Sequence, residues 1–417
     1  MVHGEVWTIK EFFTYPNEYI YWPITIVMYP YITGLVAGAF VLSSLYHVFG
    51  VKQLKDIAKF SLVFSFALLP VAMMPLLLHL TQPFRGIEVM LTPHFTSAIA
   101  AFGVVFSTYG MIVASELWFV YRKHFVEKAL ELKAKQSRSG VEGIFYLIYS
   151  LLTLGAYDIS EHALEKDEKA VGLLAAIGIP VACFLHGYVG FIFGSVKANA
   201  LWTTPLMPVI FLCSAVVSGI ALCIVTYAAV VSMRNCIYRR KKKDNPSLPD
   251  DPTIKPVDIE STRTTVKYLI AFLILAFVLE LLDMIFRIYT ATKSWDILRV
   301  VIFEHDLIKV FVLQYGIGNI LPFILLLLPG LTVRRAVIAS TCILFGVFMM
   351  RWNVVIAGQT FSSSYSGFME YHMPLAPVNL ETLKEGLAGL IAVIVTPFIL
   401  FFCFNKVMPV FGKPDSH

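Results

Sequence analysis

Nine long apolar stretches, separated by short polar connections, dominate the pattern of this chain. They lie at about 21–48, 57–80, 95–121, 170–194, 205–237, 265–290, 306–329, 334–357 and 386–409. Each is long enough to cross a bilayer as a helix, which takes roughly 20 residues. A further apolar stretch, Gly143–Gly155, is too short for an ordinary span, so we expect it to be interfacial or re-entrant, with a tenth span as the alternative. The pattern predicts an all-α polytopic integral membrane protein with nine full spans plus one short helix.

The composition agrees with this pattern and excludes a soluble domain carried on a single anchor. Of the 417 residues, 58% are hydrophobic and 15% are charged, whereas soluble domains carry about 25% charged residues. The short connections leave no room for a large extramembrane domain. We divide the chain into an outer N-terminal segment (1–20), a first membrane bundle with the start of a second (21–237), a basic cytoplasmic linker without a fold of its own (238–262), a second bundle (263–357), an outer loop (358–384) and a C-terminal helix and tail (385–417).

The basic residues of the connections predict the orientation, because cytoplasmic loops carry an excess of Lys and Arg. The connections after the first, third, fifth and seventh spans carry Lys52 and Lys55, the Arg122–Arg138 stretch, the Arg239–Lys243 run, and Arg334 with Arg335. The opposite connections are poor in basic residues. This alternation places the chain in the cell membrane with the N-terminus outside and the C-terminus in the cytoplasm. A tenth span at Gly143–Gly155 would put one of the basic stretches on the wrong side.

The sixth span, Thr265–Thr290, contains three charged residues although it is otherwise apolar. Glu280, Asp283 and Arg287 are spaced i, i+3 and i+7, so they share one helical face. An ionisable side chain at the bilayer centre costs about 2.5–3.5 kcal/mol on insertion scales, so this face must look into the protein. Two interpretations stay open at this point. Asp283 and Arg287 can form a structural ion pair, or the face can belong to a site that handles protons or a polar ligand.

Polar side chains from six segments fall at the same membrane level in this topology, near the outer surface. They are Arg85, His94, His79, His186, Tyr188, Glu280, Asp283, Arg287, Asp306, Lys309, Arg351 and Asn353. Glu116 is the main exception, and it could begin a proton route across the membrane together with Glu280. Convergent polar groups in an apolar wall are typical of a small-molecule pocket. The amphipathic ligand that suits such a pocket is a quinone, because its head needs hydrogen-bond and proton partners while its tail needs only apolar walls.

Two other classes of function stay open beside the quinone site. His79 and His186 could ligate one b-type haem axially, which an absorbance spectrum would reveal. The same carboxylates could serve a proton-coupled transporter, although no inverted repeat with broken helix pairs stands out. The six cysteines form no CxxC pair, so we expect no iron–sulfur cluster and no metal site in this chain.

Several segments together resemble the NrfD family, to which the membrane subunit of polysulfide reductase belongs. The first span, WPITIVMYPYITGLVAGAF, resembles the opening helix of the family, and its Gly34 and Gly38 allow another helix to approach closely. LLLHLTQPFR resembles a family turn in which His79 here replaces the usual Asp. The other similar segments are LLAAIGIPVACFLHGYVGFIFG, LWTTPLMPVIFLCSAVVSGIAL and MRWNVVIAGQ. The phrase HGYVGFIFGSVKANALWTTPLMP is most similar to the DsrP or HmeB-like subunits of the sulfate-reducer transmembrane complex.

The resemblance implies two four-helix bundles plus extra helices, with menaquinone bound near the outer face and no haem or cluster in the chain itself. It implies a ferredoxin-like iron–sulfur subunit docked outside, and in the branch named above also a cytochrome b, a cytoplasmic iron–sulfur subunit and a multihaem cytochrome c. We therefore expect a quinone-reactive subunit of a respiratory complex, in dissimilatory sulfur or sulfate metabolism, that is not catalytic alone.

The expected site combines catalytic and quinone-binding side chains from four spans. We assign His186, Asp283 and Glu280 as the catalytic proton partners. The residues expected to bind the quinone are His79, His186, Tyr188, Asp283, Arg287, Arg351 and Asn353. In this hypothesis, Arg287 and Arg351 hold the carboxylates ionised.

Overall fold

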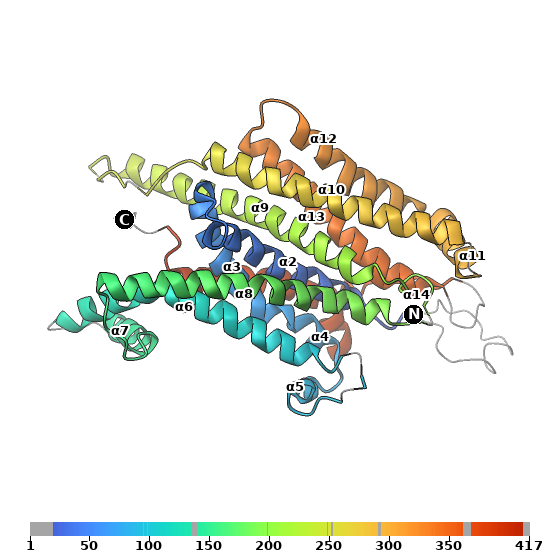
Figure 1. Cartoon of the computed structure of the whole chain (residues 1–417), viewed down its shortest axis with the longest axis horizontal. Helices are drawn as coiled ribbons and strands as arrows, with labels where there is room; N and C mark the ends of the chain where they lie inside the picture. Colours follow the sequence, from blue (N-terminus) through green and yellow to red (C-terminus); the bar gives the residue numbers. More distant parts are fainter. Residues whose placement is uncertain are drawn as a thin grey trace.

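The computed structural model describes residues 20–411 except 95, 98, 136–139, 198, 248, 252, 291–292 and 362–367. Long helices lie side by side along one axis in this part of the chain (Figure 1). Nine of the described helices are long and apolar enough to cross a membrane, which confirms the predicted polytopic all-α fold. Nearly all of the predicted N-terminal segment 1–20 lies outside the described residues.

The first four spans form one bundle and the next four form a second, as the family resemblance implies. The first bundle consists of α2 (Ile24–His47), α3 (Lys55–Ala72) continued by α4 (Met74–His79), α6 (Phe102–Ala134) and α8 (Glu161–Gly194). The second consists of α9 (Met207–Asp244), α10 (Ile259–Thr290), η4 (Ile308–Ile320) continued by α12 (Leu321–Leu327), and α13 (Val333–Trp352). The ninth span, α16 (Leu387–Val407), packs against α3.

Shorter helices connect the spans at the two ends of the molecule. They are η1 (Lys52–Leu54), η2 (Pro83–Ile87), α5 (Glu88–Leu91), α7 (Gly140–Leu152), α11 (Lys293–Arg299), η3 (Val300–His305), η5 (Asn353–Ala357), α14 (Gly358–Thr360) and α15 (Leu380–Glu385). The helix α7 covers most of the short apolar stretch at Gly143–Gly155 and packs against α6. With 13 residues it is shorter than a span, as the sequence predicts.

The two bundles meet where α2 crosses α9, and small residues let the backbones approach closely. A Cβ atom added to Gly38 would lie 2.2 Å from the carbonyl oxygen of Ala215, and one added to Gly219 would lie 2.4 Å from the Cα atom of Gly38. The neighbouring Gly34 faces the imidazole of His186, with 3.1 Å between its added Cβ and the ring. The close approach expected at Gly34 and Gly38 is therefore confirmed.

Two helices extend beyond the ends that the sequence predicts. The basic residues that follow the third span belong to α6, which continues to Ala134. The run Arg239–Lys243 belongs to α9, which continues to Asp244, while α10 begins at Ile259. The prediction of an unstructured linker from 238 to 262 was therefore wrong at both ends. Lys and Arg are good helix formers and are favourable near a helix C-terminus, so the helix continues after the apolar pattern stops.

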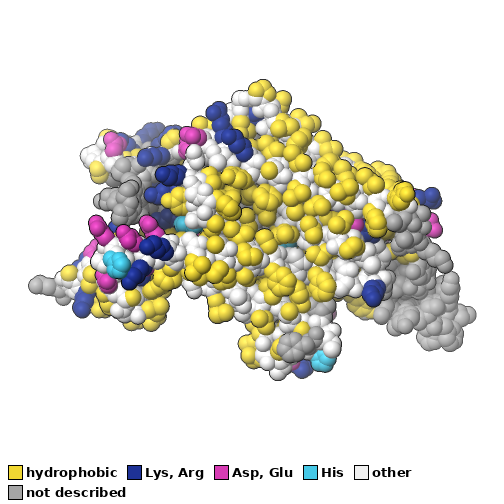
Figure 2. Space-filling model, viewed as in Figure 1, with side chains coloured by type: hydrophobic (Ala, Val, Ile, Leu, Met, Phe, Trp, Pro, Cys, Tyr) yellow, Lys and Arg dark blue, Asp and Glu magenta, His cyan; other side chains and the backbone are white. Residues whose placement is uncertain are grey.

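The surface follows the same division into a membrane-facing belt and polar ends. In Figure 2 hydrophobic side chains cover the middle of the visible face, while Lys and Arg gather at the end where α7 and the last turns of α9 lie. We call this the basic end of the molecule. The opposite end carries α11, α14 and the join between α8 and α9 (Figure 1).

Candidate functional site

A small cavity with several charged and amide side chains in a mostly apolar wall lies inside the second bundle, near the end opposite the basic end. Its volume is about 110 Å³. A cavity of roughly 150 Å³ can hold benzene, so the space here is of the order of one aromatic ring. The residues that line it are Leu201, Met207, Ile210, Glu280, Asp283, Met284, Arg287, Trp295, Val301, Ile302, Asp306, Val310, Gln314, Tyr315, Met350, Asn353, Val354 and Ala357.

Three π-helical segments form much of the cavity wall. These are η3, η4 and η5, and each contributes at least two lining residues. A π-helix is rare and is often found at a functional site, because its wider turn moves side chains off the face that a regular helix would give them. Their concentration around one cavity marks this region as the best candidate site of the described chain.

Asp283 is held by a charged partner and a neutral one, and both of its oxygens are engaged. Thr204 donates its hydroxyl to Oδ1 at 2.5 Å, and the Nε atom of Arg287 donates to Oδ2 at 2.8 Å. Arg287 also donates to the carbonyl oxygens of Ala200 and Leu201, at 2.7 and 3.1 Å. The ion pair expected between Asp283 and Arg287 is therefore present, and it also fastens α10 to the segment between α8 and α9.

Glu280, one helical turn away, has neutral hydrogen-bond partners instead. Gln314 donates its side-chain amide to Oε2 of Glu280 at 2.8 Å, and Asn353 donates to Oε1 of Gln314 at 2.7 Å. Tyr315, the residue after Gln314, also lines the cavity. The two carboxylates of the cavity thus lie three residues apart on α10 but in different electrostatic surroundings.

His186 and Arg351 form a fully buried pair that does not line the cavity. The Nη2 atom of Arg351 lies 3.0 Å from Nε2 of His186 and donates to Oγ of Ser214 at 2.8 Å. The guanidinium also stacks on the ring of Phe211, 3.8 Å from its centroid. Met350, the residue before Arg351, does line the cavity, so the pair lies directly behind the wall.

Asp306 adds a third carboxylate to the cavity wall. Its side chain is 1% exposed, and its Oδ1 atom accepts from Nζ of Lys309 at 2.5 Å and lies 3.2 Å from Nδ1 of His305. Its Oδ2 atom is buried and has no hydrogen-bond partner among the described residues. The two charged residues at the start of the seventh span are therefore paired, and Asp306 is part of the site.

Two of the other predicted residues lie elsewhere. His79 is bonded through Nδ1 to Glu385 of α15 at 2.8 Å, and it does not line the cavity. Tyr188 packs its ring beside Phe184 and Phe191 of its own helix. A shared membrane level therefore did not mean a shared cavity for these two side chains, because level fixes the height of a residue but not its lateral position. His79 and His186 have separate protein partners, and neither lines this cavity.

Sequence reasoning missed the neutral polar partners of the cavity. Gln314, Thr204 and Tyr315 were not among the expected site residues, although Gln314 is buried in an apolar span. An amide inside an apolar span was the one signal that could have identified Gln314 in advance. Trp202 supports the same region from outside the cavity: it is buried, stacks on Trp22 and donates Nε1 to the carbonyl oxygen of Val354 at 2.5 Å.

Comparisons with known proteins support the family resemblance. The model of the family described as "Polysulphide reductase, NrfD" matches residues 14–363. The chain is 27% identical over 413 residues to a selenate reductase subunit of Mesobacillus selenatarsenatis, an alignment that covers 95% of this chain and 88% of that protein. It is 27% identical over 205 residues to a dimethyl sulfoxide reductase membrane subunit of Halobacterium salinarum, which covers 49% of this chain and 42% of that protein. The match to the family model spans most of the sequence, and the chain belongs to the NrfD polysulphide reductase family.

Proposed function

We propose that this chain is the quinone-reactive membrane subunit of a respiratory electron-transfer complex, with menaquinol as its substrate. The observation that carries the proposal is the cavity in which Glu280 and Asp283 face apolar walls but have different partners. Both relatives named above are subunits of reductases, which supports a role as the membrane part of a larger enzyme.

The two carboxylates, Asp283 and Glu280, have different roles in this proposal. An ion pair holds a carboxylate ionised, so Asp283, tied to Arg287 and Thr204, orients the substrate and keeps its charge. Glu280 has neutral partners, so it can accept a proton without breaking an ion pair. Glu280 is therefore our choice for the proton acceptor. His186 and Arg351 support the cavity wall from outside, through Met350.

The polar residues of the cavity suit the oxygens of a quinone head, and the volume of the cavity accommodates one ring of the two-ring naphthoquinol. Gln314 and Asn353 place amide groups beside Glu280, where they can hydrogen-bond the oxygens of a ring. Apolar side chains such as Met207 and Ile210 complete the wall. Oxidation of one quinol releases two electrons and two protons. Glu280 accepts the two protons in turn, releasing the first before it takes the second, and the electrons pass to a partner subunit.

We propose that this partner is a ferredoxin-like iron–sulfur subunit on the outer face, with the N-terminus of the chain outside and its C-terminus in the cytoplasm. Lys and Arg gather at the opposite, basic end, which supports this orientation (Figure 2). A cytochrome b, a cytoplasmic iron–sulfur subunit and a multihaem cytochrome c are the further partners proposed for a complex of dissimilatory sulfur metabolism. That the chain itself carries neither haem nor cluster stays a prediction.

The test uses the complex purified from its own membranes. Extraction with organic solvent should release menaquinone, and the rate of quinol-dependent electron transfer should fall by about 10²–10⁴-fold in Glu280→Gln. Glu88→Gln is the matched control, because Glu88 is an exposed carboxylate outside the cavity. Unchanged quinol oxidation in Glu280→Gln, or a haem spectrum from the purified chain, would overturn the proposal.

A further inference from the structure

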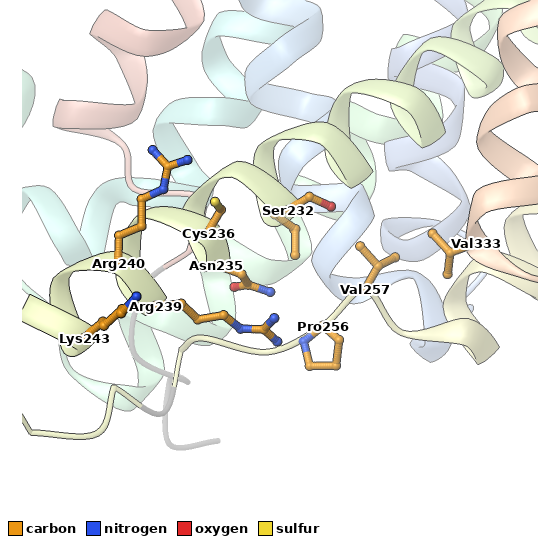
Figure 3. Close-up of a pocket in the computed structure, with 10 residues that line it drawn as sticks. Ser232, Asn235, Cys236, Arg239, Arg240, Lys243, Pro256, Val257 and Val333 are labelled. Atoms are coloured by element: carbon orange, nitrogen blue, oxygen red, sulfur yellow. The ribbon is translucent and has the colours of Figure 1, made fainter. Parts of the chain in front are cut away.

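A groove at the basic end carries cations that the proposed function does not use. It has a volume of about 560 Å³ and lies between the last turns of α9, the segment that returns to α10, and the start of α13. Figure 3 shows its lining side chains on α9, with Pro256 and Val257 beside them and Val333 at the start of α13. The residues that line it are Val231, Ser232, Asn235, Cys236, Arg239, Arg240, Lys243, Pro256, Val257 and Val333.

The returning segment neutralises one face of α9. Residues four apart share a helical face, and Arg234, Tyr238 and Lys242 are spaced in this way. Arg234 donates to the hydroxyl of Thr253, Tyr238 donates to the carbonyl oxygen of Pro249 at 3.0 Å, and Lys242 forms an ion pair with Asp250. Asp250 of the returning segment is thus engaged with this face.

The adjacent face of α9 forms the groove, and its charges are not neutralised. Arg239, Arg240 and Lys243 are exposed, and no described side chain forms an ion pair with any of them. None of the lining residues is acidic. The groove therefore carries three cations without an ion pair among the described residues, whereas the neighbouring face of the same helix is engaged by the returning segment.

The groove also changes from apolar to basic along its length. Val231, Val257 and Val333 lie at the end that adjoins the membrane-spanning part of the helices, and the cations lie about two to three turns further along α9. At 1.5 Å per residue, Val231 and Arg239 are about 12 Å apart along the axis, which matches the change from acyl chain to headgroup. Basic pockets between membrane helices bind phospholipid headgroups through the same charges.

We propose that this groove binds an anionic phospholipid of the leaflet that faces the basic end. Arg239, Arg240 and Lys243 hold its phosphate, and the valines contact the first part of its acyl chains. The bound lipid fills the space between the returning segment and α13, and so links the two helix pairs α9–α10 and α12–α13 at this end.

The test measures lipid retention by the purified, delipidated complex in native mass spectrometry. Titration with phosphatidylglycerol should give specific adducts that phosphatidylcholine does not give. The triple variant R239Q/R240Q/K243Q should bind phosphatidylglycerol about a hundredfold more weakly, at about fivefold for each charge removed. The control K52Q/K55Q/K133Q removes the same charge from exposed positions at the same end and should bind as the wild type does.

Three outcomes would overturn the proposal. An equal loss in the control variant would show a general surface-charge effect, and equal retention of phosphatidylcholine would show that the headgroup charge is not recognised. Protection of the complex against heating by inorganic phosphate, at the level given by phosphatidylglycerol, would assign the groove to free phosphate instead of a lipid. The altered side chains are exposed, so the thermal midpoint of the triple variant without lipid should equal that of the control.

Discussion

The ion pair between Asp283 and Arg287 gives a prediction about stability that the structure makes quantitative. Arg287→Met removes the hydrogen bonds to Asp283 and to the carbonyl oxygens of Ala200 and Leu201. Among the described residues, this leaves the Asp283 carboxylate, whose side chain is 16% exposed, with the hydroxyl of Thr204 as its one hydrogen-bond donor. Removing one partner of a buried ion pair costs about 3–5 kcal/mol, so we expect a loss of this size in the free energy of unfolding.

Substitution of the other member of the pair should cost less stability, because Arg287 then retains its other partners. In Asp283→Asn, Arg287 still donates to both carbonyl oxygens, and Thr204 can still donate to the amide oxygen. One charge-assisted hydrogen bond is lost, which costs about 1.5–3 kcal/mol. The double variant should lose less than the sum of the two single losses, with a coupling energy of about 1–3 kcal/mol.

The assay is the thermal midpoint of the purified complex in detergent, followed by size-exclusion chromatography of heated samples. Arg85→Gln is the control, because Arg85 pairs with Glu88 on the exposed surface, and its midpoint should equal that of the wild type. Equal midpoints for Arg287→Met and Asp283→Asn, or losses that add without coupling, would show that the pair does not fasten α10 as we argue.

Three further predictions concern packing and buried polar groups, each measured as a thermal midpoint. Gly219→Ala places a Cβ atom 2.4 Å from the backbone of α2 and should cost about 1–3 kcal/mol, whereas Gly143→Ala, with nothing within 4 Å, should be neutral or stabilising. Glu116→Leu should raise the midpoint, because both carboxyl oxygens are buried without a hydrogen-bond partner among the described residues; a lowered midpoint would contradict this. Trp202→Phe should cost about 1–3 kcal/mol, because it removes the hydrogen bond from the buried indole to the carbonyl oxygen of Val354, and an unchanged midpoint would show that this bond is dispensable.

Bilayer thickness explains why the spans could be predicted from the sequence, since it imposes a length and a composition on every helix that crosses it. Where the helices end outside the membrane could not be predicted in the same way, because that constraint no longer applies there. Arg239–Lys243 illustrates the difference. Its charge suggests a linker, but its residues are good helix formers that follow a long helix directly, and α9 continues through them.

For the candidate site, residues that share a helix were easier to predict than residues that share a cavity. The spacing of Glu280, Asp283 and Arg287 places them on the same face of one helix, and the structure has all three in the wall of one cavity. His79 was grouped with them by membrane level alone, and its partner is Glu385, far along the chain. The partner of His186 is Arg351, and no local pattern could have joined these two.

The π-helical segments explain why the partners of the carboxylates were the hardest part to predict. The periodicity of a regular α-helix gives the shared face of α10 correctly, but it does not apply to η4, where the backbone bonds follow the i→i+5 pattern. In a π-helical segment each turn holds more residues than in an α-helix. The set of residues that faces the cavity therefore differs from the set that α-helical spacing would give. Gln314 lies in η4 and Asn353 begins η5, and these two amides distinguish the surroundings of Glu280 from those of Asp283. The difference between the two carboxylates thus depends on backbone geometry in the neighbouring spans, and not on the helix that carries them both.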